Sequence, residues 1–114
     1  MDVDDGVATL FKALGDDLTA GQQYDQPVTY TPGSTVTSHT WNPTAECGDG
    51  LHLGPTPHHA TRYRPDATRW VTVAVPVAEL VPILGDTPKC KVRAGTVVGE
   101  VDIHSRPLAQ AGAA

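Results

Sequence analysis

The sequence has no long hydrophobic run. None of its apolar stretches approaches the roughly 20 residues that a helix needs to cross a bilayer. Residues 1–5 are acidic, whereas a secretory signal begins with basic residues. We therefore expect a protein without a membrane partner that stays in the cytoplasm.

Basic residues are also scarce. Eight lysines and arginines stand against 13 aspartates and glutamates, which gives a formal net charge of −5 in 114 residues. Proteins that bind nucleic acid through its phosphates collect lysine and arginine on one face, so we expect no nucleic-acid partner. One local group, Lys89, Lys91 and Arg93, alternates with apolar residues and predicts the solvated outer face of a strand.

Only two cysteines are present, Cys47 and Cys90, and we expect both to be reduced thiols. Together with the two cysteines, His52, His58 and His59 are residue types that can bind zinc. No Cys-x-x-Cys pair occurs, and the adjacent histidines would point about 100° apart on a helix, so we expect no metal site. A nucleophilic Cys47 with a histidine base is conceivable, but an inert buried thiol is the simpler interpretation.

Glycine and proline number 11 and 10, and they cut the chain into short segments bounded by turns. This distribution predicts an α+β fold, a small twisted, mainly antiparallel sheet with one or two short helices. The length fits a single domain over residues 1–114. Residues 1–6 and 108–114 are expected to be frayed.

Several segments have strand patterns. Residues 7–14 predict a first strand, and residues 27–30 and 34–38 flank a Pro-Gly turn and predict a small hairpin. Residues 68–77 predict a central strand, because four valines, Val71, Val73, Val75 and Val77, share one face. Residues 89–94 and 96–103 predict two strands separated by Gly95, a tight connection or a bulge.

The strongest helix signal covers residues 56–64. Thr56 is a good N-cap, Pro57 suits the first helical position and Pro65 would end the helix. Ala60 and Tyr63 would then share one face. A shorter helical turn is predicted at residues 77–81.

The turn Cys-Gly-Asp-Gly-Leu-His at residues 47–52 is the most informative motif. Gly48 and Gly50 allow close approach of the backbone to a ligand, and His52 would stand at the mouth of a cleft. A plain turn before a strand is the alternative. Glu100 lies within the last predicted strand between apolar neighbours, where it could face a cleft or solvent.

The chain resembles an uncharacterised family of small domains common in actinobacteria and their phages, sometimes fused to pentapeptide repeats. The likeness extends from about residue 11 to residue 103. It rests on Phe-Lys-Ala at 11–13, the Cys-Gly-x-Gly-Leu-His motif, Ala60 and Tyr63, the strand at 71–77, Lys-Cys-Lys-Val at 89–92 and Glu-Val-Asp at 100–102. The resemblance implies a phage or bacterial host but no activity.

A more distant similarity links Gly-Asp-Gly-Leu-His-Leu at 48–53 and the following helix to ADP-ribosyltransferase-like domains. It implies a cleft in which His52 and Tyr63 hold the nicotinamide of NAD, and Glu100 as the catalytic glutamate. Stabilisation of a positive, oxocarbenium-like transition state requires such an acid. This sequence has His52 where those domains have tyrosine, and residues 11–13 replace their usual first motif.

Three functions follow as alternatives. The first is a phage- or prophage-type accessory domain that binds a small ligand, such as a nucleotide, or a host protein, at Gly48, Gly50, His52 and Tyr63. The second is an ADP-ribosyltransferase-like enzyme that uses NAD, with Glu100 and His52 as catalytic residues. The third is a structural interaction module. No cofactor is required by the first or third, and NAD or a related nucleotide is implied by the second.

Overall fold

The computed structural model describes residues 2–21, 27–43, 50–83 and 89–108. All strand pairings in these residues are antiparallel. The elements are β1 (Asp2–Asp4), β2 (Val7–Leu14), β3 (Thr19–Ala20), β4 (Val28–Thr29), β5 (Thr35–Thr37), β6 (Leu51–Leu53), α1 (Pro57–Thr61), β7 (Arg69–Pro76), the 3₁₀ turn η2 (Val77–Glu79), β8 (Val81–Ile83), β9 (Lys89–Val92) and β10 (Ala94–Val101). The prediction of a mainly antiparallel α+β fold with a short helix is confirmed.

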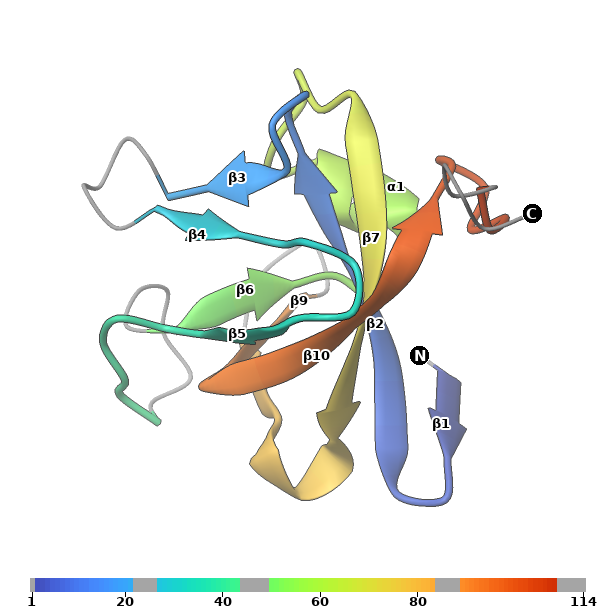
Figure 1. The fold of residues 1–114 in the computed structure, drawn as a ribbon. Helices are drawn as coiled ribbons and strands as arrows, with labels where there is room; N and C mark the ends of the chain where they lie inside the picture. Colours follow the sequence, from blue (N-terminus) through green and yellow to red (C-terminus); the bar gives the residue numbers. More distant parts are fainter. Residues whose placement is uncertain (1, 22–26, 44–49, 84–88, 109–114) are drawn as a thin grey trace.

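The largest sheet has five strands in the order β1-β2-β7-β10-β5. β7 lies at its centre, as predicted for residues 68–77 (Figure 1). A second sheet has the order β6-β9-β8, and β3 pairs with β4. Reciprocal backbone hydrogen bonds between Phe11 and Gly54, 2.8 and 2.9 Å long, join β2 to the end of β6. This bridge joins the five-stranded sheet to the sheet of β6, β9 and β8.

The core lies on one face of β2 and β7. Val71, Val73 and Val75 alternate along β7 and are completely buried, as the period-two pattern predicts. Leucines of β2 and β6 pack into the same cluster, together with Tyr30, Val36, Val92 and Val97. Val77 does not continue this face, because the chain turns into η2 there and leaves its side chain 37% exposed.

The short helix α1 covers the opposite face of β2 and β7. Its N-terminus has the predicted cap, since the backbone N–H of His59 donates to Thr56 Oγ1 at 3.1 Å. The indole Nε1 of Trp70 on β7 donates to Thr61 Oγ1 at 2.9 Å. The helix ends earlier than the predicted residue 64, because Arg62 and the next two residues form i to i−3 turns.

Two local predictions in the N-terminal half were wrong. Residues 1–6 were expected to be frayed, but Asp2–Asp4 pair with β2 as strand β1. The predicted hairpin of residues 27–30 and 34–38 does not form. Instead β4 pairs with β3, and β5 pairs with β10 through contacts more than 50 residues apart in sequence. Residues 109–114 lie outside the described residues.

Two predictions in the C-terminal third were also wrong. The break between the last two strands falls at Arg93, and Gly95 lies within β10. The bulge comes later, where the pairing of β10 with β7 shifts between Val97 and Gly99. Lys91 is not solvated but 1% exposed. Its side chain packs beside Gly50, and its ammonium lies 5.9 Å from the centre of the Trp41 ring, so residues from outside the strand cover it.

Within the described part of the chain, no helix reaches the length and hydropathy of a membrane span.

Candidate functional site

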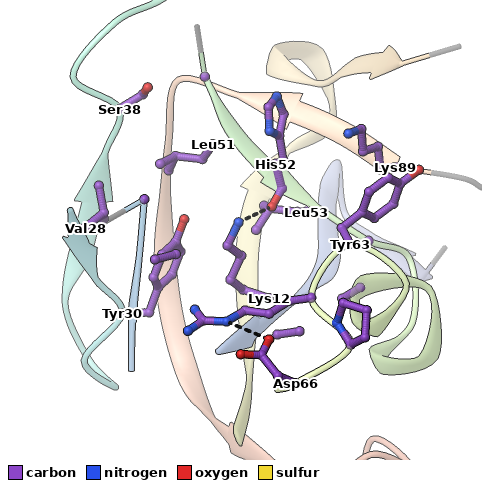
Figure 2. Close-up of a pocket in the computed structure, with 18 of the residues that line it drawn as sticks. Lys12, Val28, Tyr30, Ser38, Leu51, His52, Leu53, Tyr63, Asp66 and Lys89 are labelled. Atoms are coloured by element: carbon purple, nitrogen blue, oxygen red, sulfur yellow. Dashed lines mark hydrogen bonds and ion pairs between the residues drawn. The ribbon is translucent and has the colours of Figure 1, made fainter. Parts of the chain in front are cut away.

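The main cavity of the described structure opens where β2, β6 and the start of β9 come together. It has a volume of about 710 Å³. Its apolar lining includes Val28, Leu51, Leu53 and Ala60, while its polar lining comes from several separate segments. Figure 2 shows Lys12, His52, Tyr63 and Lys89 around one space.

The structure brings three of the predicted ligand-binding residues to this cavity. Gly50, His52 and Tyr63 all line it. A Cβ at position 50 would lie 2.8 Å from Lys91 Cδ and 3.1 Å from the Trp41 ring, so a side chain there would meet packed neighbours. This close approach explains the glycine. Gly48 and Cys47 lie outside the described residues.

Glu100 lies elsewhere. Its carboxylate accepts two hydrogen bonds from the Arg69 guanidinium, at 2.6 and 2.9 Å. It lines a second, smaller cavity of about 480 Å³ with Thr72 and Leu108, not the cavity of His52 and Tyr63. The Arg69 hydrogen bonds are the main cause that lowers the pKa of Glu100. The predicted catalytic glutamate is thus paired as an ionised carboxylate.

His52 contributes a neutral imidazole. β6 alternates, so Leu51 and Leu53 are buried while His52 between them is only partly buried, and all three residues line the cavity. Burial of the ring, together with the positive charges of Lys89, Lys12 and Lys91, lowers its pKa to about 4. At neutral pH the ring can act as a hydrogen-bond donor or acceptor, and it carries no charge.

Lys12 is the central cation of the cavity. It belongs to β2, and its ammonium Nζ donates to the backbone carbonyl of His52 at 2.9 Å and lies 5.8 Å from the centre of the Tyr30 ring. No carboxylate of the described residues pairs with it. Burial lowers the pKa of Lys12 to about 8, with smaller contributions from the positive charges of Arg64 and Lys89.

Two further cations line the cavity. Arg64 follows α1, and its Nη1 donates to the carbonyl of Thr19 at 2.9 Å. Its ion pair with Asp66 is long, 3.7 Å, and the Asp66 side chain is 84% exposed, so it offsets little of the positive charge. Lys89 Nζ lies 4.0 Å from the centre of the Tyr63 ring, a cation–π contact across the cavity.

Tyr30 forms a wall of the cavity from the segment after β4. Its side chain is 1% exposed, and its backbone N–H donates to Leu18 at 2.8 Å. Burial raises the pKa of Tyr30 far above its ordinary value, so the phenol stays neutral. It presents an aromatic surface and a hydroxyl to the same space as Lys12.

The residues weighed for a metal or a reactive thiol are dispersed. His58 and His104 place their ring centres 5.9 Å apart, and neither residue lines the cavity. Across the described ranges, no three histidine, cysteine, aspartate or glutamate side chains gather as metal ligands would. Burial raises the pKa of the Cys90 thiol, which disfavours the reactive thiolate.

Comparison with known proteins assigns a family. Residues 8–107 match the model of a family described as a domain of unknown function, DUF7666. The chain belongs to this family. No curated protein and no solved structure shows significant similarity to the chain. The site of this DUF7666 domain is therefore described from its own residues.

Sequence reasoning missed the three cations of the cavity. Lys12 had a detectable signal, because a lysine between Phe11 and Ala13 interrupts an otherwise apolar strand. Arg64 had no such signal, and Lys89 was predicted on the solvated outer face of a strand. They meet Lys12 only through the packing of β2, β9 and the segment after α1.

Proposed function

We propose that this DUF7666 domain binds a small anionic ligand, of the nucleotide class or another phosphate or carboxylate compound, in the cavity around Lys12. The observation that carries the proposal is the gathering of Lys12, Arg64 and Lys89 in one cavity of a protein whose formal net charge is −5. Among the described lining residues Asp66 is the one carboxylate.

The physical argument concerns uncompensated charge. Like charges brought together in a partly buried space raise the energy of the empty state, and a bound anion relieves that energy. The neutral His52 ring and the apolar wall suit the uncharged part of such a ligand. Lys89 Nζ lies 4.0 Å from the centre of the Tyr63 ring. The two side chains therefore offer a cation for the anionic group of a ligand and an aromatic surface for a flat group next to it.

The size and shape of the site favour a small molecule over a host protein. The cavity volume lies within the usual range for ligand pockets, about 300–1,000 Å³. If the protein is a phage-type accessory domain, its role would then be to capture a small host metabolite. A structural interaction module would instead need a binding surface outside this cavity.

An ADP-ribosyltransferase-like activity on NAD is the second candidate. It is favoured by the presence of His52 and Tyr63 in one cavity. Glu100, the residue that this chemistry requires, is engaged by Arg69 and lines another cavity. We therefore rank binding above turnover. Loss of NAD during incubation with the protein, abolished in Glu100→Gln, would reverse this order.

The test is a thermal-shift titration of the purified chain with inorganic phosphate, ADP, ADP-ribose and NAD, and with adenosine as the uncharged counterpart. A ligand at 100 times its dissociation constant should raise the free energy of unfolding by about 2.7 kcal/mol. We expect stabilisation by at least one of the anions and none by adenosine.

A matched pair of variants locates the site. Lys89→Gln removes a cation from the cavity and should weaken anion binding about tenfold, as expected for one charged hydrogen bond. Arg93→Gln removes a cation from an exposed position outside the cavity and should leave the affinity within about twofold. No shift with any anion, or equal losses in both variants, would refute the proposal.

A further inference from the structure

We infer that the Lys12 amine condenses reversibly with a carbonyl group of the bound anion, an aldehyde or a 2-oxo acid, to form an imine. This inference rests on the proposed function and deepens it, since it names the ligand class as carbonyl compounds that also carry a phosphate or carboxylate. It assigns Lys12 as a nucleophile and not only as a counter-charge.

The Lys12 side chain borders the cavity in which a ligand would bind. Lys12 comes from the middle of β2, lines the cavity and is partly buried. Within the described residues its contacts are the His52 carbonyl at 2.9 Å and the Tyr30 ring at 5.8 Å. Neither contact engages the nitrogen lone pair, because the amine donates a hydrogen in the first case and faces a π surface in the second.

The surroundings also favour the neutral, nucleophilic form. A lysine becomes reactive when it is desolvated or lies near another cation, and Lys12 has both conditions, with Arg64 and Lys89 nearby. A pKa of about 8 instead of 10.5 leaves about a tenth of the amine neutral at pH 7, roughly 300 times the ordinary fraction.

The step balances without an oxidant or a reductant. The Nζ lone pair attacks the carbonyl carbon, the C–N bond forms, the carbon–oxygen π bond breaks, and the nitrogen passes one proton to that oxygen. The resulting hydroxyl takes a second proton from solvent and leaves as water, while the nitrogen lone pair forms the C=N bond of the protonated imine. The His52 carbonyl, which now accepts from the amine, can accept the remaining N–H of the protonated imine. Arg64 and Lys89 can hold the anionic end of the ligand.

The other two lysines of the chain have different surroundings. Lys89 also lines the cavity, but its ammonium lies against the Tyr63 ring. Lys91 is 1% exposed and does not line the cavity. Three lysines and the N-terminal amine make a short set of competing sites, so the modified nitrogen can be identified without ambiguity.

The experiment traps the imine by reduction. The purified chain is incubated at pH 7 with glyoxylate, glycolaldehyde phosphate or uncharged glycolaldehyde, each with cyanoborohydride, and the modified peptides are mapped by mass spectrometry. We expect the two anionic carbonyl compounds to label Lys12 at least tenfold more than Lys89. Glycolaldehyde should show no such preference.

A competition separates binding from covalent chemistry. Inorganic phosphate should slow the labelling of Lys12 if both occupy the same cavity. Lys12→Arg keeps a positive charge but should lose the trapped adduct, whereas Arg93→Gln, at an exposed position outside the cavity, should retain both the adduct and the phosphate-induced thermal shift. Anion binding without labelling of Lys12 in the wild-type chain would overturn this inference and leave the proposed function intact. Absence of both would refute both proposals.

Discussion

Lys12 and Glu100 are partly buried charged residues on long strands of the same sheet, yet their surroundings differ. Glu100 is matched by the Arg69 fork at 2.6 and 2.9 Å, so its charge is neutralised within the fold. Lys12 has the carbonyl of His52 as its hydrogen-bond acceptor and two further cations nearby. The Glu100 charge is therefore paired within the fold, whereas the described residues around Lys12 leave positive charge that an outside anion can neutralise.

The backbone beside the cavity is packed more tightly than the backbone beside Glu100. A pair of glycine substitutions, one in each region, measures this difference. At Gly54, beside the cavity, an added Cβ would lie 2.8 Å from the Ala60 backbone nitrogen, so α1 would have to move. We expect Gly54→Ala to lower the free energy of unfolding by about 2–3 kcal/mol. Denaturant unfolding monitored by circular dichroism gives the value.

The control is Gly99→Ala, next to Glu100. An added Cβ there meets nothing within 4 Å, so the loss should stay below about 0.5 kcal/mol. Equal losses in both variants would show that the tight packing is not specific to the cavity side.

As the pH falls, the stabilising contribution of His52 in the cavity should be lost before the ion pair of Arg69 and Glu100 weakens. The folded-state pKa of His52 is lowered from 6.5 to about 4, so between these values the unfolded chain binds a proton that the folded chain does not. The stabilising contribution is present above pH 6.5 and is lost as the pH falls toward 4. Since the ring is partly exposed and screened, we expect a loss of about 1–2 kcal/mol.

This prediction is checked by denaturant unfolding at several pH values with His52→Asn. The variant should flatten the stability profile between pH 6.5 and 4, while His58→Asn, at an exposed position of α1, should keep it. The pKa of Glu100 is lowered from 4.5, so the Arg69 pair should weaken only at lower pH. An unchanged slope in His52→Asn would contradict the assignment.

Removal of charge should have opposite effects in the two regions when no ligand is bound. Lys12→Met deletes a desolvated cation that lies near two others, and the pKa shift from 10.5 to about 8 corresponds to about 3 kcal/mol. Loss of the hydrogen bond to the His52 carbonyl and residual solvent screening reduce this gain. We expect Lys12→Met to raise the free energy of unfolding at pH 7 by about 1 kcal/mol.

Glu100→Gln provides the contrast. It breaks a bidentate ion pair and should lower the free energy of unfolding by about 1 kcal/mol, because the Arg69 side chain is 36% exposed and partly solvated. Thermal and urea unfolding of both variants in phosphate-free buffer measures the difference. If the free energy of unfolding changed with the same sign in both variants, the distinction between the paired Glu100 and the clustered cations around Lys12 would be lost.

The sequence predicted those features that depend on local patterns. Alternating valines placed β7 at the centre, and Thr56 with Pro57 placed the start of α1. The wrong predictions depend on long-range strand pairing. The predicted hairpin of residues 27–30 and 34–38 does not form, because Val36 of β5 pairs with Gly95 of β10. Lys91 alternates like a surface residue but is buried because Gly50 and Trp41, which are distant in sequence, pack against its side chain. In the cavity, the sequence predicted that Gly50 and His52 would lie together, and it did not predict the cations beside them.

The most direct test of the account is an NMR titration of the isotopically labelled chain with inorganic phosphate, followed by ADP. We predict progressive amide shifts at Lys12, His52, Tyr63 and Lys89, with Arg69 and Glu100 unchanged. Shifts confined to the strand that carries Glu100, or none at millimolar phosphate and ADP, would contradict the claim that the cations gathered in this cavity form an anion-binding site.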